Sequence, residues 1–160
     1  MPRSASGHDA LAVAARLQEI ARERGDTLTP LQIIKLVYLC HGWMLGLHGR
    51  PLIRESVEAW TYGPVIPSLY QALKQYRSSP VTEPIQCDPA QFSAEEESVI
   101  REVYENYGDL DGVQLSSLTH HRDSPWAITW KRWGRSGTIS NDVIEHHFAQ
   151  LAHDQPSASP

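Results

Sequence analysis

Residues 29–70 of this 160-residue chain read TPLQIIKLVYLCHGWMLGLHGRPLIRESVEAWTYGPVIPSLY. The first part predicts one helix, because Thr29 is a good N-cap, Pro30 suits the first helical turn and Gly49 suits a left-handed C-cap. Apolar side chains fill nearly every position between these ends, which is typical of a helix buried in the core of a globular protein. We therefore expect a central helix around which the rest of the chain packs.

The second part of this stretch changes character. Residues 57–62 (VEAWTY) form a short β-prone run, and the turn signal Gly63-Pro64 ends it. Helical spacing resumes over residues 66–76. We expect Trp60 and Tyr62 to lie on the same face of the extended run, because side chains alternate along a strand.

Periodicity and capping residues predict further helices outside this stretch, at residues 9–24, 94–107, 113–119, 126–133 and 140–151. The predicted fold is mainly α: a single compact domain of about five to six helices around a buried central helix, with a small β element near Trp60. The domain is expected to span residues 9–152, with a disordered N-terminus at 1–8 and a disordered tail at 153–160.

Composition and charge exclude several classes of protein. The formal net charge of −5 argues against general nucleic-acid binding, which normally needs a basic surface. The two cysteines form neither a disulfide framework nor a metal-ligand spacing, and this suits a reducing compartment. The N-terminal residues show no apolar leader, and the apolar helix is too short and too interrupted to span a membrane. We expect a cytoplasmic protein without a membrane partner.

Charge is distributed unevenly along the chain. Carboxylates crowd the predicted helix 94–107 and its flanks, where Arg101 is the cation. Negative charge near a helix N-terminus is favourable in itself, and the remaining carboxylates could present a negative surface to a basic partner. Lys35 is isolated on the apolar helix, and we expect an internal ion pair, a side chain that reaches solvent, or a contact with a partner.

The sequence offers no motif of a known catalytic or cofactor site. It contains eight histidines, among them the adjacent pairs His120-His121 and His146-His147, but neighbouring helical residues do not face each other. No HExxH motif, GxSxG elbow or glycine-rich phosphate loop occurs. We therefore expect no enzyme, no cofactor and no metal. A site assembled from distant histidines, or from Asp, Glu and His of different helices, stays open.

Aromatic residues are concentrated near the C-terminal end. Trp126, Trp130 and Trp133 recur at helical spacing and are interleaved with cations. This spacing predicts a stripe that faces the core, while stacking on nucleic-acid bases is the alternative.

Two motifs resemble the Panacea antitoxin domain, the SocA-like family. The first runs through Leu31-x-x-x-Lys35-Leu36-Val37-Tyr38, Gly42-Trp43 and Glu58-Ala59-Trp60-x-Tyr62-Gly63-Pro64-Val65-Ile66-Pro67-x-x-Tyr70. The second is Leu115-Ser116-x-Leu118-Thr119-His120 with Pro125-Trp126 downstream. The resemblance extends over residues 9–148, and the positions that match the family signature are Lys35, Tyr38, Trp60, Tyr62, Gly63, Pro64, Thr119, His120 and Trp126.

This resemblance implies an antitoxin that neutralises a cognate protein toxin by direct binding. Members of the family also act as proteolytic adaptors that deliver the toxin to the ClpXP protease, so ClpXP is a second expected partner. The signature residues are expected either to contact the partner or to support the shared fold. The alternatives are a DNA-binding autorepressor, against which the acidic charge argues, and a histidine-dependent enzyme.

Overall fold

The computed structural model describes residues 7–154, so the segments 1–6 and 155–160 of the predicted disordered ends lie outside it. Its elements in chain order are α1 (Ala10–Glu23), α2 (Pro30–His48), β1 (Val57–Trp60), β2 (Gly63–Val65), α3 (Pro67–Leu73), the 3-10 helix η1 (Lys74–Tyr76), α4 (Ala94–Tyr107), α5 (Gly112–Thr119), α6 (Pro125–Trp133), β3 (Gly137–Ile139) and α7 (Asn141–Asp154). The mainly helical class is confirmed. The described residues form seven α-helices, and each of the helical segments expected from the sequence is present, so the total of five to six was an undercount.

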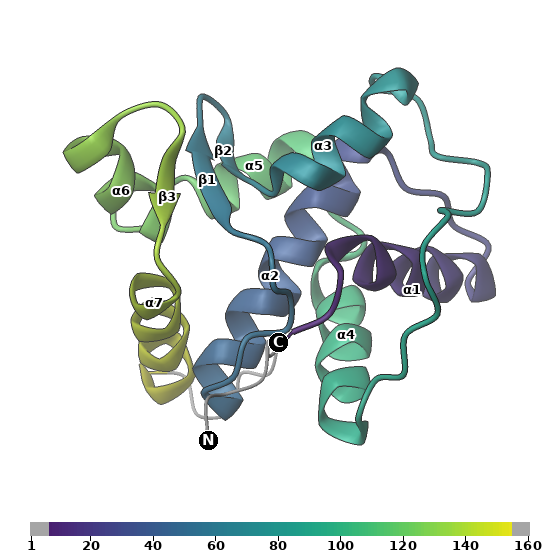
Figure 1. The fold of residues 1–160 in the computed structure, drawn as a ribbon, viewed down its shortest axis with the longest axis horizontal. Helices are drawn as coiled ribbons and strands as arrows, with labels where there is room; N and C mark the ends of the chain where they lie inside the picture. The colour runs from purple at the N-terminus through teal and green to yellow at the C-terminus, as the bar shows by residue number, and fades with distance from the viewer. Residues whose placement is uncertain (1–6, 155–160) are drawn as a thin grey trace.

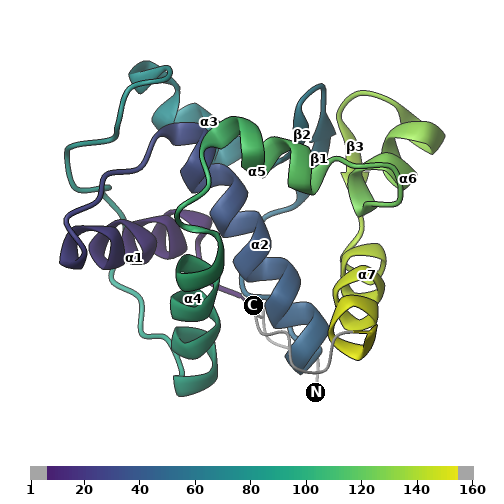
Figure 2. The same cartoon turned by 180° about the vertical axis from the view of Figure 1, so that it is seen from behind.

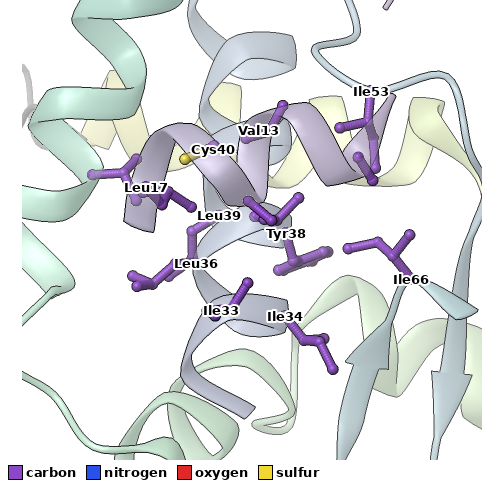
Figure 3. Packing of buried hydrophobic residues seen from close by; sticks show 14 of the residues in the cluster. Val13, Leu17, Ile33, Ile34, Leu36, Tyr38, Leu39, Cys40, Ile53 and Ile66 are labelled. Atoms are coloured by element: carbon purple, nitrogen blue, oxygen red, sulfur yellow. The ribbon is translucent and has the colours of Figure 1, made fainter. Parts of the chain in front are cut away.

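Helix α2 is the centre of the fold, as predicted. Its N-terminus carries a capping box in which the Thr29 hydroxyl accepts a hydrogen bond from the Gln32 N–H, and Gly49 ends it with a left-handed φ of 67°. Helices α1 and α4 cover one side of α2, and α7 covers the other (Figures 1 and 2). Buried side chains of α2, α1 and the segments around Ile53 and Ile66 form one continuous core (Figure 3).

Helix α7 approaches α2 very closely, and glycines make this possible. A Cβ atom at Gly42 would lie 2.3 Å from the Phe148 ring, and one at Gly46 would lie 2.6 Å from the Phe148 Cβ. Because Gly42 and Gly46 have no side chain, the Phe148 ring fits against α2 and packs edge-on against Trp43, at a centroid distance of 5.3 Å. The Gly-x-x-x-Gly spacing on α2 therefore forms the groove into which α7 docks.

The β element is larger than predicted. It is a three-stranded antiparallel sheet in the order β2-β1-β3, with Trp60 paired to Gly63 and Val57 paired to Ile139. The strand β1 ends at Trp60, so Tyr62 lies in the tight turn to β2 and not in the strand. The expectation that Trp60 and Tyr62 share one face is therefore wrong: Trp60 is half-buried, whereas Tyr62 is 75% exposed.

Candidate functional site

Lys35 connects the central helix to the β-hairpin. Its side chain is fully buried, and its Nζ donates a hydrogen bond to the Pro64 carbonyl at 2.8 Å. Within residues 7–154 it neither forms an ion pair nor reaches solvent, so both structural expectations for this residue are wrong. Loss of water around the ammonium lowers the pKa of Lys35 to about 7. The amine therefore titrates near neutral pH while it holds the hairpin.

Gly63 is the residue that lets these groups meet. Its φ is 119°, a conformation that side chains rarely adopt, and a Cβ atom there would lie 2.7 Å from the Lys35 Nζ. The same Cβ would lie 3.4 Å from the Thr119 Oγ1 and 3.5 Å from the His120 Cβ. Gly63 is thus enclosed between the Lys35 amine of α2 and the C-terminal end of α5.

Trp126 closes the other side of this arrangement. Its indole Nε1 donates a hydrogen bond of 2.6 Å to the Trp60 carbonyl, which ties α6 to β1. The His120 ring packs edge-on against Trp126 at 5.2 Å, and its Nδ1 donates to the Ser116 carbonyl. We use the name hairpin cluster for the seven residues Lys35, Trp60, Gly63, Pro64, Thr119, His120 and Trp126.

The hairpin cluster joins both sequence motifs, which are far apart in the chain. Glu58 and Ser116 contact the hairpin cluster but were not among the predicted site residues, although both stand in the two sequence motifs. Glu58 accepts a hydrogen bond of 2.9 Å from the Trp60 indole, and Ser116 supplies the carbonyl that binds His120. Their positions in the motifs, Glu58-Ala59-Trp60 and Leu115-Ser116, were the signal that could have identified them.

The remaining two signature residues lie outside the hairpin cluster. Tyr62 projects from the tip of the turn into solvent. Tyr38 is buried one turn further along α2, with its ring edge-on to Phe148 at 6.0 Å, and among residues 7–154 its hydroxyl has no hydrogen-bond partner. Tyr38 and Thr119 both line a cavity of about 120 Å³ between α2, α5 and α7.

The polar groups of the hairpin cluster bind atoms of this chain. The Thr119 hydroxyl donates at 2.8 Å to the Leu115 carbonyl within its own helix, so it is not paired with a base. The Lys35 amine is enclosed behind the Gly63-Pro64 turn, where nothing from solvent reaches it. The Lys35 side chain and the Trp126 indole each donate a hydrogen bond to a backbone carbonyl of the hairpin. Hydrogen bonds of this kind fix the position of the strand and of α6.

The tryptophans of α6 divide between two environments. Trp126 and Trp130 are half-buried and stack at a centroid distance of 5.0 Å, as a core-facing stripe predicts. Trp133 is 67% exposed at the end of the helix, so the expected stripe is wrong at this position. The Arg132 guanidinium lies over the Trp133 ring, with its Cζ 5.3 Å from the ring centroid.

The histidines also separate into different roles. His41 is a neutral core histidine: its Nδ1 accepts hydrogen bonds from the N–H groups of Leu52 and Ile53, its Nε2 contacts Asn141, and burial lowers its pKa to about 4. His121 and His147 come together at a ring distance of 5.9 Å. Among residues 7–154 no three His, Cys, Asp or Glu side chains are placed to hold a metal ion.

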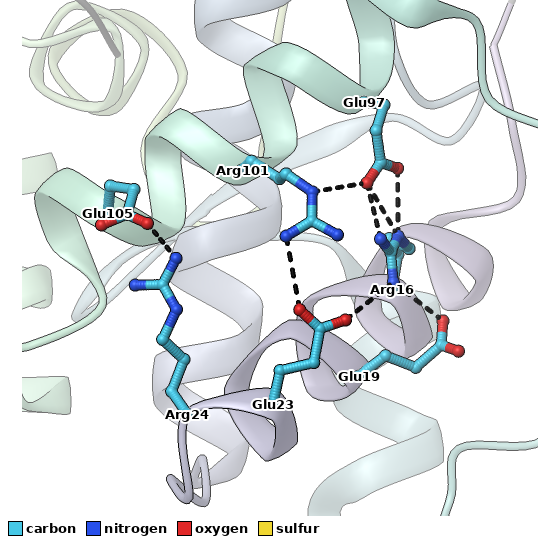
Figure 4. A network of polar contacts seen from close by, with 7 residues as sticks. All are labelled: Arg16, Glu19, Glu23, Arg24, Glu97, Arg101 and Glu105. Carbon is cyan, nitrogen blue, oxygen red and sulfur yellow. Dashed lines mark hydrogen bonds and ion pairs between the residues drawn. The ribbon is translucent and has the colours of Figure 1, made fainter.

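The carboxylates of α4 face their own chain. Glu97 binds Arg16 of α1 at 2.6 Å and Arg101 at 3.0 Å, and Arg24 pairs with Glu105 (Figure 4). The hydrogen bond from Arg16 holds the pKa of Glu97 below its usual value. The negative charge of this helix is therefore partly neutralised by Arg16 and Arg24, and Glu95 pairs in addition with Arg50.

The sequence that forms the hairpin cluster matches the model of a known protein family. The family described as Antitoxin SocA-like, Panacea domain, matches residues 33–127, which is more than half of the chain, and this protein belongs to it. Among curated proteins, Antitoxin SocA of Caulobacter vibrioides (strain NA1000 / CB15N) is 41% identical over 63 residues, or 39% of this chain. That alignment spans 34% of the relative, about a third of its length. No solved structure matches this chain.

The family match includes all of the signature positions, from Lys35 to Trp126. Within residues 7–154 the structure has no helix that is long and apolar enough to cross a membrane.

Proposed function

We propose that this protein is an antitoxin that binds a cognate protein toxin directly and thereby neutralises it in the cytoplasm. The observation that carries the proposal is the family match over residues 33–127, which contains the whole hairpin cluster. The internal hydrogen bonds of the cluster support a binding role, because a rigid surface loses little conformational entropy when a partner docks.

The signature residues would then divide into two groups. The seven residues of the hairpin cluster, together with Tyr38, support the fold, since their polar atoms bind backbone or are buried. Tyr62 is the signature residue that is free to contact a partner. Tyr62→Ala should weaken neutralisation without changing stability, whereas Val113→Ala, at a similarly exposed position (73%), should change neither.

The proposal is tested by co-expression with the product of the adjacent open reading frame, in hosts with and without ClpXP. We expect this protein to restore growth and to copurify with the neighbouring product. Protection in both hosts would establish that masking is sufficient. Protection only with ClpXP would identify a proteolytic adaptor. A harmless neighbour that never copurifies would refute the antitoxin role.

Two other functions make different predictions. An autorepressor would bind its own operator with strong salt dependence, whereas the net charge of −5 favours no such binding. A histidine-dependent enzyme would lose function when His120, His121 or His147 is replaced, even though the toxin complex still forms. The antitoxin proposal predicts instead that complex formation and protection are lost together.

A further inference from the structure

The surface between α6 and α7 contains a long groove that the hairpin cluster does not use. Its volume is about 730 Å³, and Ile128 of α6 and Val143 and Leu151 of α7 contribute apolar side chains to its lining. Ile128 is 52% exposed, unusually high for an isoleucine on a helix that packs against its neighbours. Exposed apolar surface of this kind, with a polar rim, is typical of an interaction site.

The polar rim of the groove is acidic. Asp123 in the turn before α6, and Asp142 and Asp154 near the two ends of α7, belong to the lining, and all three are exposed. Among residues 7–154 these carboxylates form no ion pair, unlike those of α4. The two ends of α7 are separated by roughly 18 Å along the helix axis. Burial lowers the pKa of His147, which belongs to the same lining.

The groove continues into the interior. His121, His147 and Leu151 line both the groove and the cavity of about 120 Å³ beside Tyr38. Apolar cavities of about 150 Å³ accept a benzene-sized group, so this cavity suits one aliphatic or small aromatic side chain. Tyr38, one of the cavity-lining residues, has a fully buried hydroxyl without a partner among the described residues.

We propose that the groove between α6 and α7 is the docking site for a short amphipathic segment of a partner protein. One apolar side chain of that segment fills the cavity beside Tyr38, and Lys or Arg residues at both ends of the segment pair with Asp123, Asp142 and Asp154. A helix or extended peptide laid into a groove in this way is a common recognition mode. The assignment rests on the proposed antitoxin function, because it identifies the partner as the toxin.

The test measures binding of the purified product of the adjacent open reading frame to the full chain. We expect Ile128→Ser to weaken binding about tenfold, because it removes an apolar contact from the centre of the interface. The double variant Asp123→Asn with Asp142→Asn should weaken binding about threefold to tenfold at low salt, and this difference should shrink at high salt. The matched controls are Val113→Ser and Asp88→Asn, which change exposed residues outside the groove.

Hydrogen exchange gives a second readout that does not depend on a variant. Binding should slow exchange of the amides in residues 121–128 and 142–154 more than in α1 or α4. The groove assignment is overturned if the wild type binds the toxin and restores growth but the groove variants bind equally well. It is also overturned if hydrogen exchange slows in other parts of the chain. In both cases the antitoxin function stands. If the wild type neither binds nor protects, the antitoxin function fails, and the groove assignment fails with it.

Discussion

Gly63→Ala should destabilise the protein strongly, because two separate costs act at this position. A residue with a side chain at a φ of 119° carries strain of roughly 1–3 kcal/mol. The new Cβ would also lie 2.7 Å from the Lys35 Nζ, so the buried amine must leave the Pro64 carbonyl. Loss of that hydrogen bond costs about 1–3 kcal/mol. Together the free energy of unfolding should fall by roughly 2–6 kcal/mol, a large share of the stability of a domain this size.

Urea unfolding followed by tryptophan fluorescence measures this loss. Gly25→Ala is the matched control, because its φ is also positive, at 74°, and no atom lies within 4 Å of the added Cβ. This control should cost only about 1–2 kcal/mol. Methionine at position 35 lacks the terminal nitrogen, so in a Lys35→Met background Gly63→Ala should lose the part of its cost that comes from the amine. The explanation is refuted if Gly63→Ala costs no more than Gly25→Ala, or costs the same in both backgrounds.

Three further predictions follow from buried groups. Burial lowers the pKa of Lys35 from 10.5 to about 7, so the unfolded chain binds more protons between these pH values. The free energy of unfolding should therefore rise with pH across this window, by roughly 5 kcal/mol in total. Lys35→Met should abolish that rise, as chemical unfolding at a series of pH values would show. Gly42→Ala should cost about 1–3 kcal/mol in urea unfolding, because its Cβ would lie 2.3 Å from the Phe148 ring. Tyr38→Phe should raise the melting temperature by an amount equivalent to about 1 kcal/mol, because it removes a buried hydroxyl without a partner.

Each of these predictions can fail in a distinct way. An unchanged pH profile in Lys35→Met would show that the pKa of Lys35 in the folded chain stays near its ordinary value of 10.5. A Gly42→Ala variant as stable as the wild type would show that α7 shifts freely on α2. A Tyr38→Phe variant that is less stable would show that the hydroxyl is satisfied in solution. If Tyr38→Phe is more stable but binds the toxin less tightly, the Tyr38 hydroxyl contributes to binding of the toxin.

The helix boundaries were predictable because local signals define them. The capping boxes at Thr29 and Ser93 and the proline after Ser124 begin helices where the sequence indicated. The strands β2 and β3 were missed because strands of three residues have no measurable periodicity. Strand β3 in addition pairs with β1, some eighty residues earlier in the chain, and no local pattern encodes such a partner.

The candidate site was predictable only in part, for a similar reason. The sequence marked Lys35 as an anomalous charge, but its partner is a backbone carbonyl that carries no side-chain signal. The acidic helix was conspicuous in sequence, yet its charges pair with arginines of α1, which lie about eighty residues away. The groove between α6 and α7 was not anticipated, because its lining combines residues from two helices and a turn.

The docking of α7 on α2 has a consequence for how this protein is made. The central helix emerges from the ribosome early, but the Gly42 and Trp43 side of it is covered by Phe148, more than a hundred residues later. Until α7 has been synthesised, a broad apolar face stays uncovered, and such a face recruits chaperones or aggregates. A chain that terminates before α7 would therefore not be a partly active antitoxin. Protection by this protein should begin only when translation has passed α7.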